Sequence, residues 1–301
     1  NNVERNLLSF VKNISFDNDK LQIFLNEKIK ILDKEILDKG ISISNNIITI
    51  SNFAFKPSRD FFIWEGNRIT GLTELGQEQI SITFPSETES IDRSVFANNK
   101  VVESVDMSLS KVSSISEGSG LGLFENCTNL KSVILPDSLQ TIGVSAFENC
   151  KKLNYVKLPE SLESISLYAF KNCWSLSSIE LNNKLSKIGA WSFQFAGLTK
   201  ITIPESVTEI GQNAFEYCDQ LVEVEILANL KEIKQYTFSS CSNLESINIP
   251  DSVTKIGTYS FKGCLKATLY VSSEEMKSRL EKFWIMSIEK ENIKVKEKSF
   301  D

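Results

Sequence analysis

The sequence predicts a repeat solenoid, an α+β fold with mainly parallel β-structure built from coils of 22 or 23 residues. One observation is a pattern whose first leucine recurs at nearly fixed steps, at Leu130, Leu153, Leu176, Leu198, Leu221 and Leu244. A second observation is a column of phenylalanines with the same spacing, and a third is a column of cysteines three residues after them. Such a period predicts coils that stack and share one continuous core.

Residues 1–78 are expected to form a capping region with a helical part followed by β-hairpins. Residues 1 to about 40 carry apolar side chains at helical spacing, and Gly40 is a suitable stop. The pattern then changes to a period of two, which predicts a strand or a hairpin over residues 41–50 and a β-hairpin over residues 61–72. The end of a coil array is apolar, so this region is expected to cover it.

Residues 79–271 are predicted to form the solenoid, a right-handed array of about eight coils. Leu130, Val133 and Leu135 alternate as an inward-facing strand requires, and Pro136 ends that strand because proline cannot extend a β-ladder. A later isoleucine forms a second inward row. In four coils a glycine follows that isoleucine and suggests a turn with positive φ: Gly143, Gly189, Gly211 and Gly257.

Two parts of the chain depart from the regular coil. One early coil carries an inserted segment, Glu117–Gly120, which is either a tolerated loop extension or a binding edge. Residues 272–301 are expected to form a C-terminal cap, in which Ser272 or Ser273 caps a helix and residues 293–295 form a last strand.

The phenylalanine and cysteine columns are predicted to be structural. The phenylalanines would fill the interior with offset ring contacts, and they are Phe124, Phe147, Phe170, Phe193, Phe215, Phe238 and Phe261. The six cysteines are Cys127, Cys150, Cys173, Cys218, Cys241 and Cys264. This column has three possible interpretations: disulfide bonds, a metal site, or a small buried residue at a tight bend. Uniform spacing without Cys-x-x-Cys, with Ala196 in the one missing place, favours the third and assigns no metal or cofactor.

Composition excludes several functional classes. The net charge of −6 disfavours nucleic-acid binding, and the absence of histidine removes Ser-His-Asp and Cys-His nucleophile pairs. The sequence contains no run of 18 apolar residues, so no membrane span is predicted. We therefore expect no catalytic site. The sequence begins at Asn1 without an export leader, so we expect that any such signal or anchor was removed.

The repeat itself carries a family resemblance. Leu198–Cys218 reads Leu-x-x-Ile-x-Ile-Pro-x-Ser-Val-x-x-Ile-Gly-x-x-Ala-Phe-x-x-Cys, and residues 244–264 match it almost fully. Together with the lead-in at 66–71 and the closing segment at 269–273, this resembles the BspA-like leucine-rich repeat family of bacterial surface proteins. The resemblance spans about residues 79–295. It implies an extracellular or cell-surface protein of a bacterium or mucosal parasite that adheres to host matrix proteins or other cells, and it transfers no functional residue.

Two surfaces are candidate binding sites. The outward side of the strands offers Tyr155, Lys157, Glu180, Glu223 and Glu225, and it is either a binding face or an ordinary solvated sheet face. The position two residues before the phenylalanine column is aromatic in four coils, and this aromatic row, with Trp174 nearby, is either an interaction surface or outer packing. Its members are Tyr168, Trp191, Tyr236 and Tyr259.

We expect a non-catalytic binding or adhesion protein that presents its coils to a protein ligand on a host matrix or another cell. One alternative is a self-assembling envelope protein, and a more distant one is a carbohydrate-binding module. The sequence leaves the oligomeric state and the ligand open. A glycosidase would need two carboxylates in a cleft, which a uniform solenoid does not supply.

Overall fold

The computed structural model divides the chain into two units, residues 1–56 and 57–301, which are considered separately. Side chains are described for 59–281 and 288–296. The residues whose backbone is described are 11–17, 20–25, 41–44, 47–51, 59–281 and 288–296.

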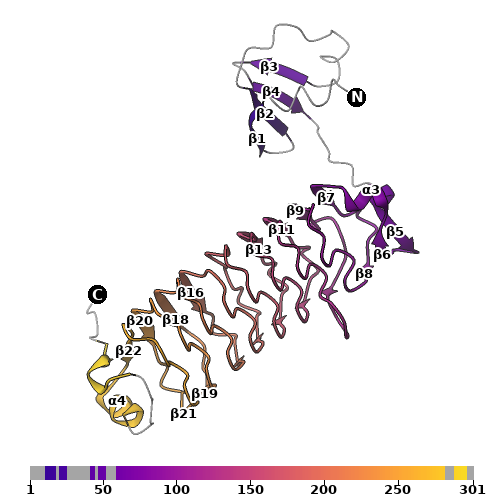
Figure 1. Cartoon of the computed structure of the whole chain (residues 1–301). Coiled ribbons are helices and arrows are strands. Elements are labelled where there is room, and N and C mark those ends of the chain that lie inside the picture. The colour runs from indigo at the N-terminus through magenta and orange to yellow at the C-terminus, as the bar shows by residue number, and fades with distance from the viewer. Residues whose placement is uncertain are drawn as a thin grey trace. The chain divides into compact units, whose positions relative to one another are not determined.

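The first unit contains a four-stranded antiparallel sheet with the order β1-β2-β4-β3 (Figure 1). Its strands are β1 (Val11–Asp17), β2 (Lys20–Leu25), β3 (Ile41–Ser44) and β4 (Ile47–Ser51). A strand or a hairpin was predicted over residues 41–50, and β3 and β4 form the hairpin. The helix prediction is wrong where β1 and β2 lie. A short apolar run such as Leu21–Leu25 fits the helical and the strand period, and here its pairing with β4 makes it a strand. The rest of the predicted helix, residues 26–40 and 1–10, lies outside the described residues.

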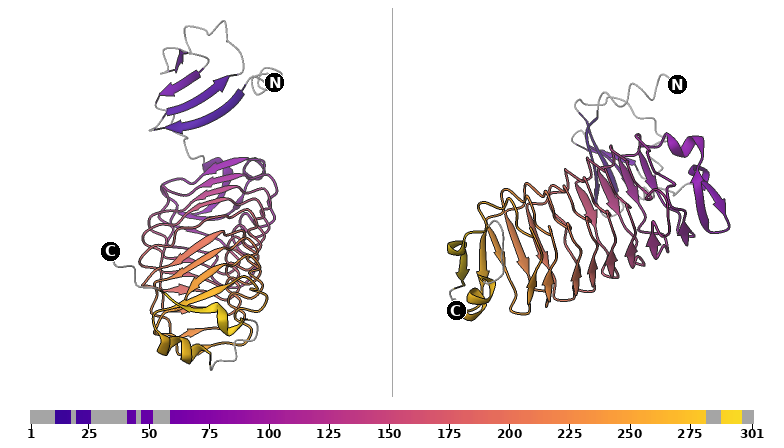
Figure 2. Two further views of the ribbon diagram at one scale, coloured as in Figure 1. Left: turned by 90° about the vertical axis from the view of Figure 1, so that its left-hand side faces the viewer. Right: turned by 60° about the horizontal axis from the view of Figure 1, so that its bottom comes forward.

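The second unit is a solenoid, which confirms the predicted fold class (Figures 1 and 2). It has about ten stacked coils, where about eight were predicted. One side of it, the strand face, consists of a four-stranded and a five-stranded parallel sheet. Successive coils pair in register, as Val133 with Val156. The strands of this face are β7 (Ser81–Thr83), β9 (Ser104–Asp106), β11 (Ser132–Ile134), β13 (Tyr155–Lys157), β16 (Lys200–Ile203), β18 (Glu223–Ile226), β20 (Ser246–Asn248), β22 (Thr268–Val271) and β23 (Ile293–Val295).

A second side carries two-residue strands that contain the second inward isoleucine. These are β8 (Ser90–Ile91), β10 (Ser114–Ile115), β12 (Thr141–Ile142), β14 (Ser164–Ile165), β15 (Lys187–Ile188), β17 (Glu209–Ile210), β19 (Glu232–Ile233) and β21 (Lys255–Ile256). The prediction of positive φ at the four glycines after this isoleucine is wrong. They sit instead where the neighbouring coil comes close: a Cβ on Gly143 would lie 2.3 Å from the carbonyl oxygen of Ser116.

The third side, the turn edge, bends sharply around each interior phenylalanine. Except before Phe124, the residues two before and two after the phenylalanine adopt left-handed backbone conformations, as at Ser145 (φ 55°) and Asn149 (φ 62°). The N–H groups of these two residues and of the phenylalanine donate to the next coil, for example Phe147 N to the oxygen of Ala169 at 2.8 Å. This bend points every phenylalanine inward and satisfies the backbone by pairing coil to coil.

The core is a set of columns that run the length of the solenoid. From Phe124 to Phe261 the rings are fully buried and stack with centroids 5.1–5.7 Å apart, within 10° of parallel. All six cysteines are buried and free. Each thiol donates to the phenylalanine carbonyl of the preceding coil, as Cys150 Sγ to the oxygen of Phe124 at 3.1 Å. The cysteine column thus adds a hydrogen-bond ladder to its role as a small apolar residue.

Both ends of the solenoid carry extra elements. At the start, the 3₁₀ turn η2 (Arg59–Phe61), the hairpin β5 (Phe62–Glu65) and β6 (Arg68–Leu72), and the short helix α3 (Glu74–Gln77) lead into the first coil, and β6 pairs with β8. At the other end, α4 (Glu274–Leu280) and the 3₁₀ turn η3 (Lys290–Asn292) precede β23. Ser273 caps α4 by accepting from the N–H of Met276 at 3.2 Å. The hairpin, the serine cap and the last strand agree with the sequence prediction.

Candidate functional site

One coil interrupts the strand face. Among the described residues, no backbone hydrogen bond joins Ser178–Leu181 to the coil on either side, and this unpaired segment separates the two sheets. We call it the strand-face gap. Pairing resumes at its borders, where Thr199 N donates to the oxygen of Ser177 at 3.0 Å and Ser186 N to the oxygen of Glu163 at 2.8 Å.

Two local sequence features accompany the gap. Asn182 stands where the neighbouring coils have proline, and its side chain donates to the carbonyl oxygen of Pro159 at 2.5 Å. The turn that follows this coil is one residue shorter, since Gly197 alone separates Ala196 from Leu198. That turn is also tight, because a Cβ on Gly197 would lie 2.0 Å from the carbonyl oxygen of Trp174.

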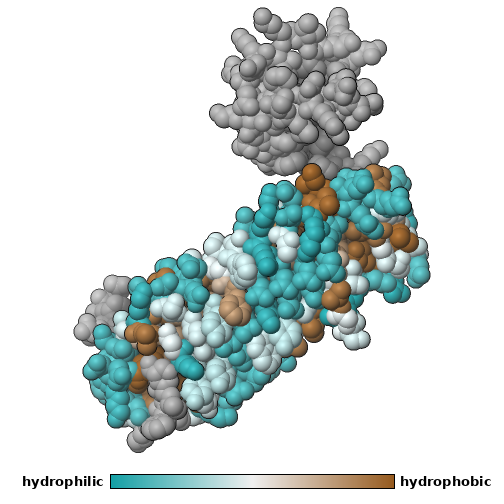
Figure 3. Space-filling view, in the orientation of Figure 1, coloured by the Kyte–Doolittle hydropathy of each residue, from teal (hydrophilic) through white to brown (hydrophobic). Residues whose placement is uncertain are grey.

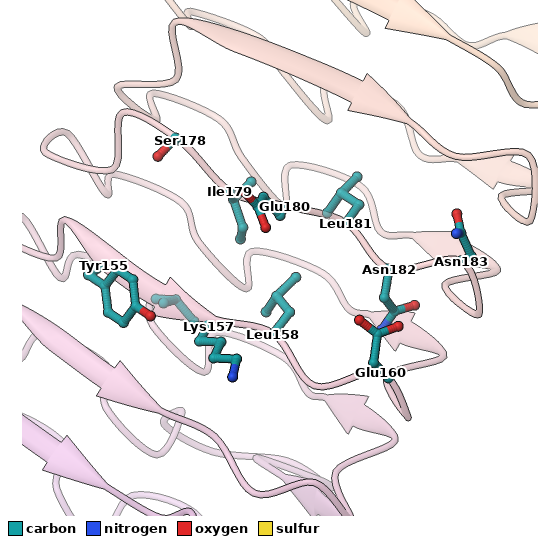
Figure 4. A pocket seen from close by; sticks show the side chains of 11 residues that line it. Tyr155, Lys157, Leu158, Glu160, Ser178, Ile179, Glu180, Leu181, Asn182 and Asn183 are labelled. Atoms are coloured by element: carbon teal, nitrogen blue, oxygen red, sulfur yellow. The ribbon is translucent and has the colours of Figure 1, made fainter. Parts of the chain in front are cut away.

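Hollows lie on both sides of the gap. The larger, of about 430 Å³, lies between β13 and the unpaired segment, and the smaller, of about 320 Å³, lies towards β16. Figure 4 shows Tyr155 and Lys157 on β13 and Glu180 on the neighbouring segment, around the larger hollow. Three of the residues predicted for the strand face therefore come together, and Tyr155 is 53% exposed.

The other two predicted carboxylates lie on β18 and have partners of their own. Glu223 forms an ion pair with Lys200, with 2.6 Å between Oε2 and Nζ. The hydrogen bond to this carboxylate raises the pKa of Lys200. Glu225 accepts from the hydroxyl of Thr202 at 3.3 Å. Among the described residues, no group of three or more His, Cys, Asp or Glu residues could hold a metal ion.

The aromatic row is half-buried. Tyr168 packs against Trp191 with ring centroids 5.5 Å apart, and Tyr236 packs against Tyr259 at 5.4 Å. Asn213 stands between the two pairs and donates to Glu216 at 2.8 Å. The row is therefore two separate ring pairs with much of their area already covered.

Two exposed aromatic side chains of the turn edge lie on a neighbouring row that sequence reasoning largely missed. The position two residues after the phenylalanine is asparagine in four coils, and the amide side chains form a ladder over Asn98, Asn126, Asn149 and Asn172. The next two coils place Phe195 and Tyr217 there, with rings stacked at 4.6 Å and 3°. Trp174, Phe195 and Tyr217, the exposed aromatic set, are 56%, 37% and 41% exposed. The break in the asparagine column was a visible signal of this set.

The inserted segment Glu117–Gly120 is held by an arginine whose role the sequence did not suggest. The guanidinium of Arg93 donates to the carbonyl oxygens of Ser116, Gly118 and Gly120 at 2.6–2.8 Å, and to that of Val144 at 3.0 Å. These contacts order the insertion against the coils next to it. In the part of the chain that the structure describes, no helix is long and apolar enough to cross a membrane.

Comparisons with known proteins agree with the fold. A family model described as BspA type leucine-rich repeat region (6 copies) matches residues 76–173, 117–244 and 143–270. The crystal structure of a leucine-rich repeat protein from T. pallidum (TpLRR) is 25% identical with a TM-score of 0.52, and it covers 79% of this chain and 97% of that one.

Weaker similarity extends to a leucine-rich cell-surface protein from Faecalibacterium prausnitzii A2-165, at 17% identity and a TM-score of 0.34, covering 87% of this chain and 89% of that one. No curated protein matches the chain. The overlapping family matches take in more than half of its length. The chain therefore belongs to the BspA-type leucine-rich repeat family.

Proposed function

We propose that this chain is a non-catalytic cell-surface or secreted protein that binds a protein ligand, on a host matrix or another cell, through its turn edge. The observation that carries the proposal is the backbone of two members of the exposed aromatic set. Phe195 and Tyr217 both adopt φ 59°, a left-handed conformation that asparagine tolerates and bulky side chains avoid. Because these rings stay substantially exposed, burial does not offset the cost, and strain of this kind is typical of functional positions.

The chemistry of the set suits a protein ligand. Exposed aromatic side chains are enriched at the centres of protein interfaces, where they contribute large contact areas at low entropic cost. Trp174 also lies under the ammonium of Lys151, 4.6 Å from the ring centroid, which adds a charged rim. The aromatic row, Tyr168, Trp191, Tyr236 and Tyr259, would border the same surface. Family membership supports the surface location.

The test compares three variants for binding to a panel of purified matrix proteins and to intact epithelial cells. The first replaces the exposed set (W174S, F195N, Y217N) and should weaken binding at least tenfold while the circular dichroism spectrum stays unchanged. The second replaces the four row residues by serine and should lower stability as well as affinity. Tyr155→Ser, which removes an exposed aromatic from the strand face, should bind like the wild type.

Unchanged binding by the first variant would contradict the site. Sedimentation at several concentrations separates the proposal from self-assembly in an envelope layer. A chain that stays monomeric argues against the assembly alternative, whereas concentration-dependent association that the first variant abolishes would favour it over ligand binding.

A further inference from the structure

The strand-face gap leaves main-chain groups without partners on three consecutive stretches. β13 pairs with β11 on one side, and β16 pairs with β18 on one side. Their other edges face Ser178–Leu181, which pairs with neither. Each strand of a parallel sheet presents N–H and C=O groups to both sides, so all three stretches retain an unused edge. An unpaired edge is a template for another strand.

The space beside these edges has the size of a ligand site. The hollow between β13 and the gap, at about 430 Å³, falls within the range of about 300–1,000 Å³ that is common for binding pockets. Leu158, Ile179 and Leu181 contribute apolar surface to it, and Lys157 and Glu180 contribute opposite charges (Figure 4). The three residues of β13 span about 10 Å, the length of three extended residues.

We propose that the strand-face gap binds an extended segment of a partner polypeptide, which pairs with the free edge of β13 by main-chain hydrogen bonds. The groups left without partners are amides and carbonyls repeating at strand spacing, and another extended backbone is the ligand that matches that repeat. Alternate side chains of the segment would contact the half-buried Leu181 and the edges of the buried Leu158 and Ile179. The others would lie near Lys157 and Glu180. This inference does not depend on the exposed aromatic set.

A gap-closing variant follows from the coil one step earlier. Tyr155–Pro159 reads Tyr-Val-Lys-Leu-Pro and begins with a paired strand, whereas residues 178–182 read Ser-Ile-Glu-Leu-Asn. The substitutions S178Y, I179V, E180K and N182P copy the first sequence onto the second and should close the gap. The matched control, S132Y with I134K, places the same outward side chains on β11, which is already paired on both sides.

The experiment selects a displayed library of random linear heptapeptides on the full chain and measures the affinity of the enriched peptides by calorimetry. They should bind the wild type, the β11 control and the W174S/F195N/Y217N variant within twofold of one another, and the gap-closing variant at least tenfold more weakly. N-methylation of one alternating set of peptide amides should weaken binding to the wild type at least tenfold, because it removes the donors that pair with the edge, and the other set should tolerate it.

Failure to enrich any peptide would overturn the proposal, as would equal affinity for the wild-type and a gap-closing variant that hydrogen exchange shows to be paired. Indifference to N-methylation at every position would also overturn it. That last measurement uses only the wild-type chain, so it decides even if the gap-closing variant does not fold.

Discussion

The middle coils, residues 174–217, differ from the coils on either side mainly on their outer surface, and inside them Ala196 takes the place of a column cysteine. Outside them the strand face is paired from coil to coil, and on their N-terminal side the turn edge carries the asparagine ladder. Within them the strand face opens, exposed aromatic side chains replace asparagine, and the repeat shortens to 22 residues at Gly197. The phenylalanine column passes through without change, with centroids 5.3 Å apart before Phe193 and 5.4 Å after it.

This difference separates stacking from function. A solenoid tolerates surface change in one coil as long as each coil presents the same interior to its neighbours. Both proposed binding surfaces lie in or beside the same few coils, although they face different sides. If the interior is continuous, equivalent core substitutions in the middle and flanking coils should lower stability equally. If the surface of the middle coils serves binding, its aromatic residues should lower the stability of the chain.

The largest expected effect concerns alkaline pH and the cysteine column. Burial raises the pKa of Cys127 to about 12 and also raises the pKa of Cys150, Cys173, Cys218 and Cys241. The unfolded thiols lose protons above about pH 9 while the folded ones keep them, so stability is intact below pH 9 and falls as the pH rises. Well above pH 9, each of these five thiols should remove about 1.4 kcal/mol per pH unit from the free energy of unfolding. Cys264 should not contribute, because its hydrogen bond with Cys241 lowers its pKa.

Urea unfolding at pH 8, 9, 9.5 and 10 measures this slope. Cys150→Ala should reduce the slope of the free energy of unfolding against pH by the contribution of one thiol. Ala196→Cys should increase this slope by the same amount, because position 196 is as buried as the other places in the column. A slope unaffected by either substitution would show that other groups cause the alkaline loss.

The second effect compares one ring from each region. Phe147→Ala in the flanking coils and Phe193→Ala in the middle coils should each destabilise by about 3–5 kcal/mol, because each leaves a large cavity in a dry column. Urea denaturation at neutral pH should give values within about 1 kcal/mol of each other. A much smaller loss at Phe193 would mean that the interior has loosened beneath the strand-face gap.

Sequence periodicity predicted the interior well because interior positions are dictated by stacking. The leucine, isoleucine and phenylalanine positions had to be inward, and nearly all of them are buried, whereas Ile91, Leu181 and Ile256 are partly buried. The strand-face gap was not predicted, since Leu176, Ile179 and Leu181 keep the repeat pattern although the strand there is lost. Pairing between strands depends on the neighbouring backbone as well as on the residue pattern.

Prediction was weakest where one pattern allows two structures. The apolar run from Leu21 to Leu25 fits a helix and a strand equally, and pairing with β4 decided the outcome. The glycines after the second isoleucine row did mark positions that require glycine. The predicted reason was a positive φ, whereas the structure shows close approach of the neighbouring coil. At the candidate site the positive φ falls instead at Phe195 and Tyr217, where the preceding coils have asparagine.

The smallest expected effect tests whether the exposed aromatic set costs stability. Phe195→Asn with Tyr217→Asn should stabilise the chain by about 1 kcal/mol, because asparagine relieves two strained left-handed residues and extends the ladder from Asn172, while one ring stack is lost. Asn149→Phe, the reverse change in the flanking coils, should destabilise by about 1–2 kcal/mol, since it breaks the amide ladder and finds no ring to stack on. Thermal and urea unfolding of the three chains measure both changes.

Stabilisation together with loss of binding would show that these aromatic residues are kept for the ligand. Destabilisation by the asparagine pair would instead make the rings part of the packing.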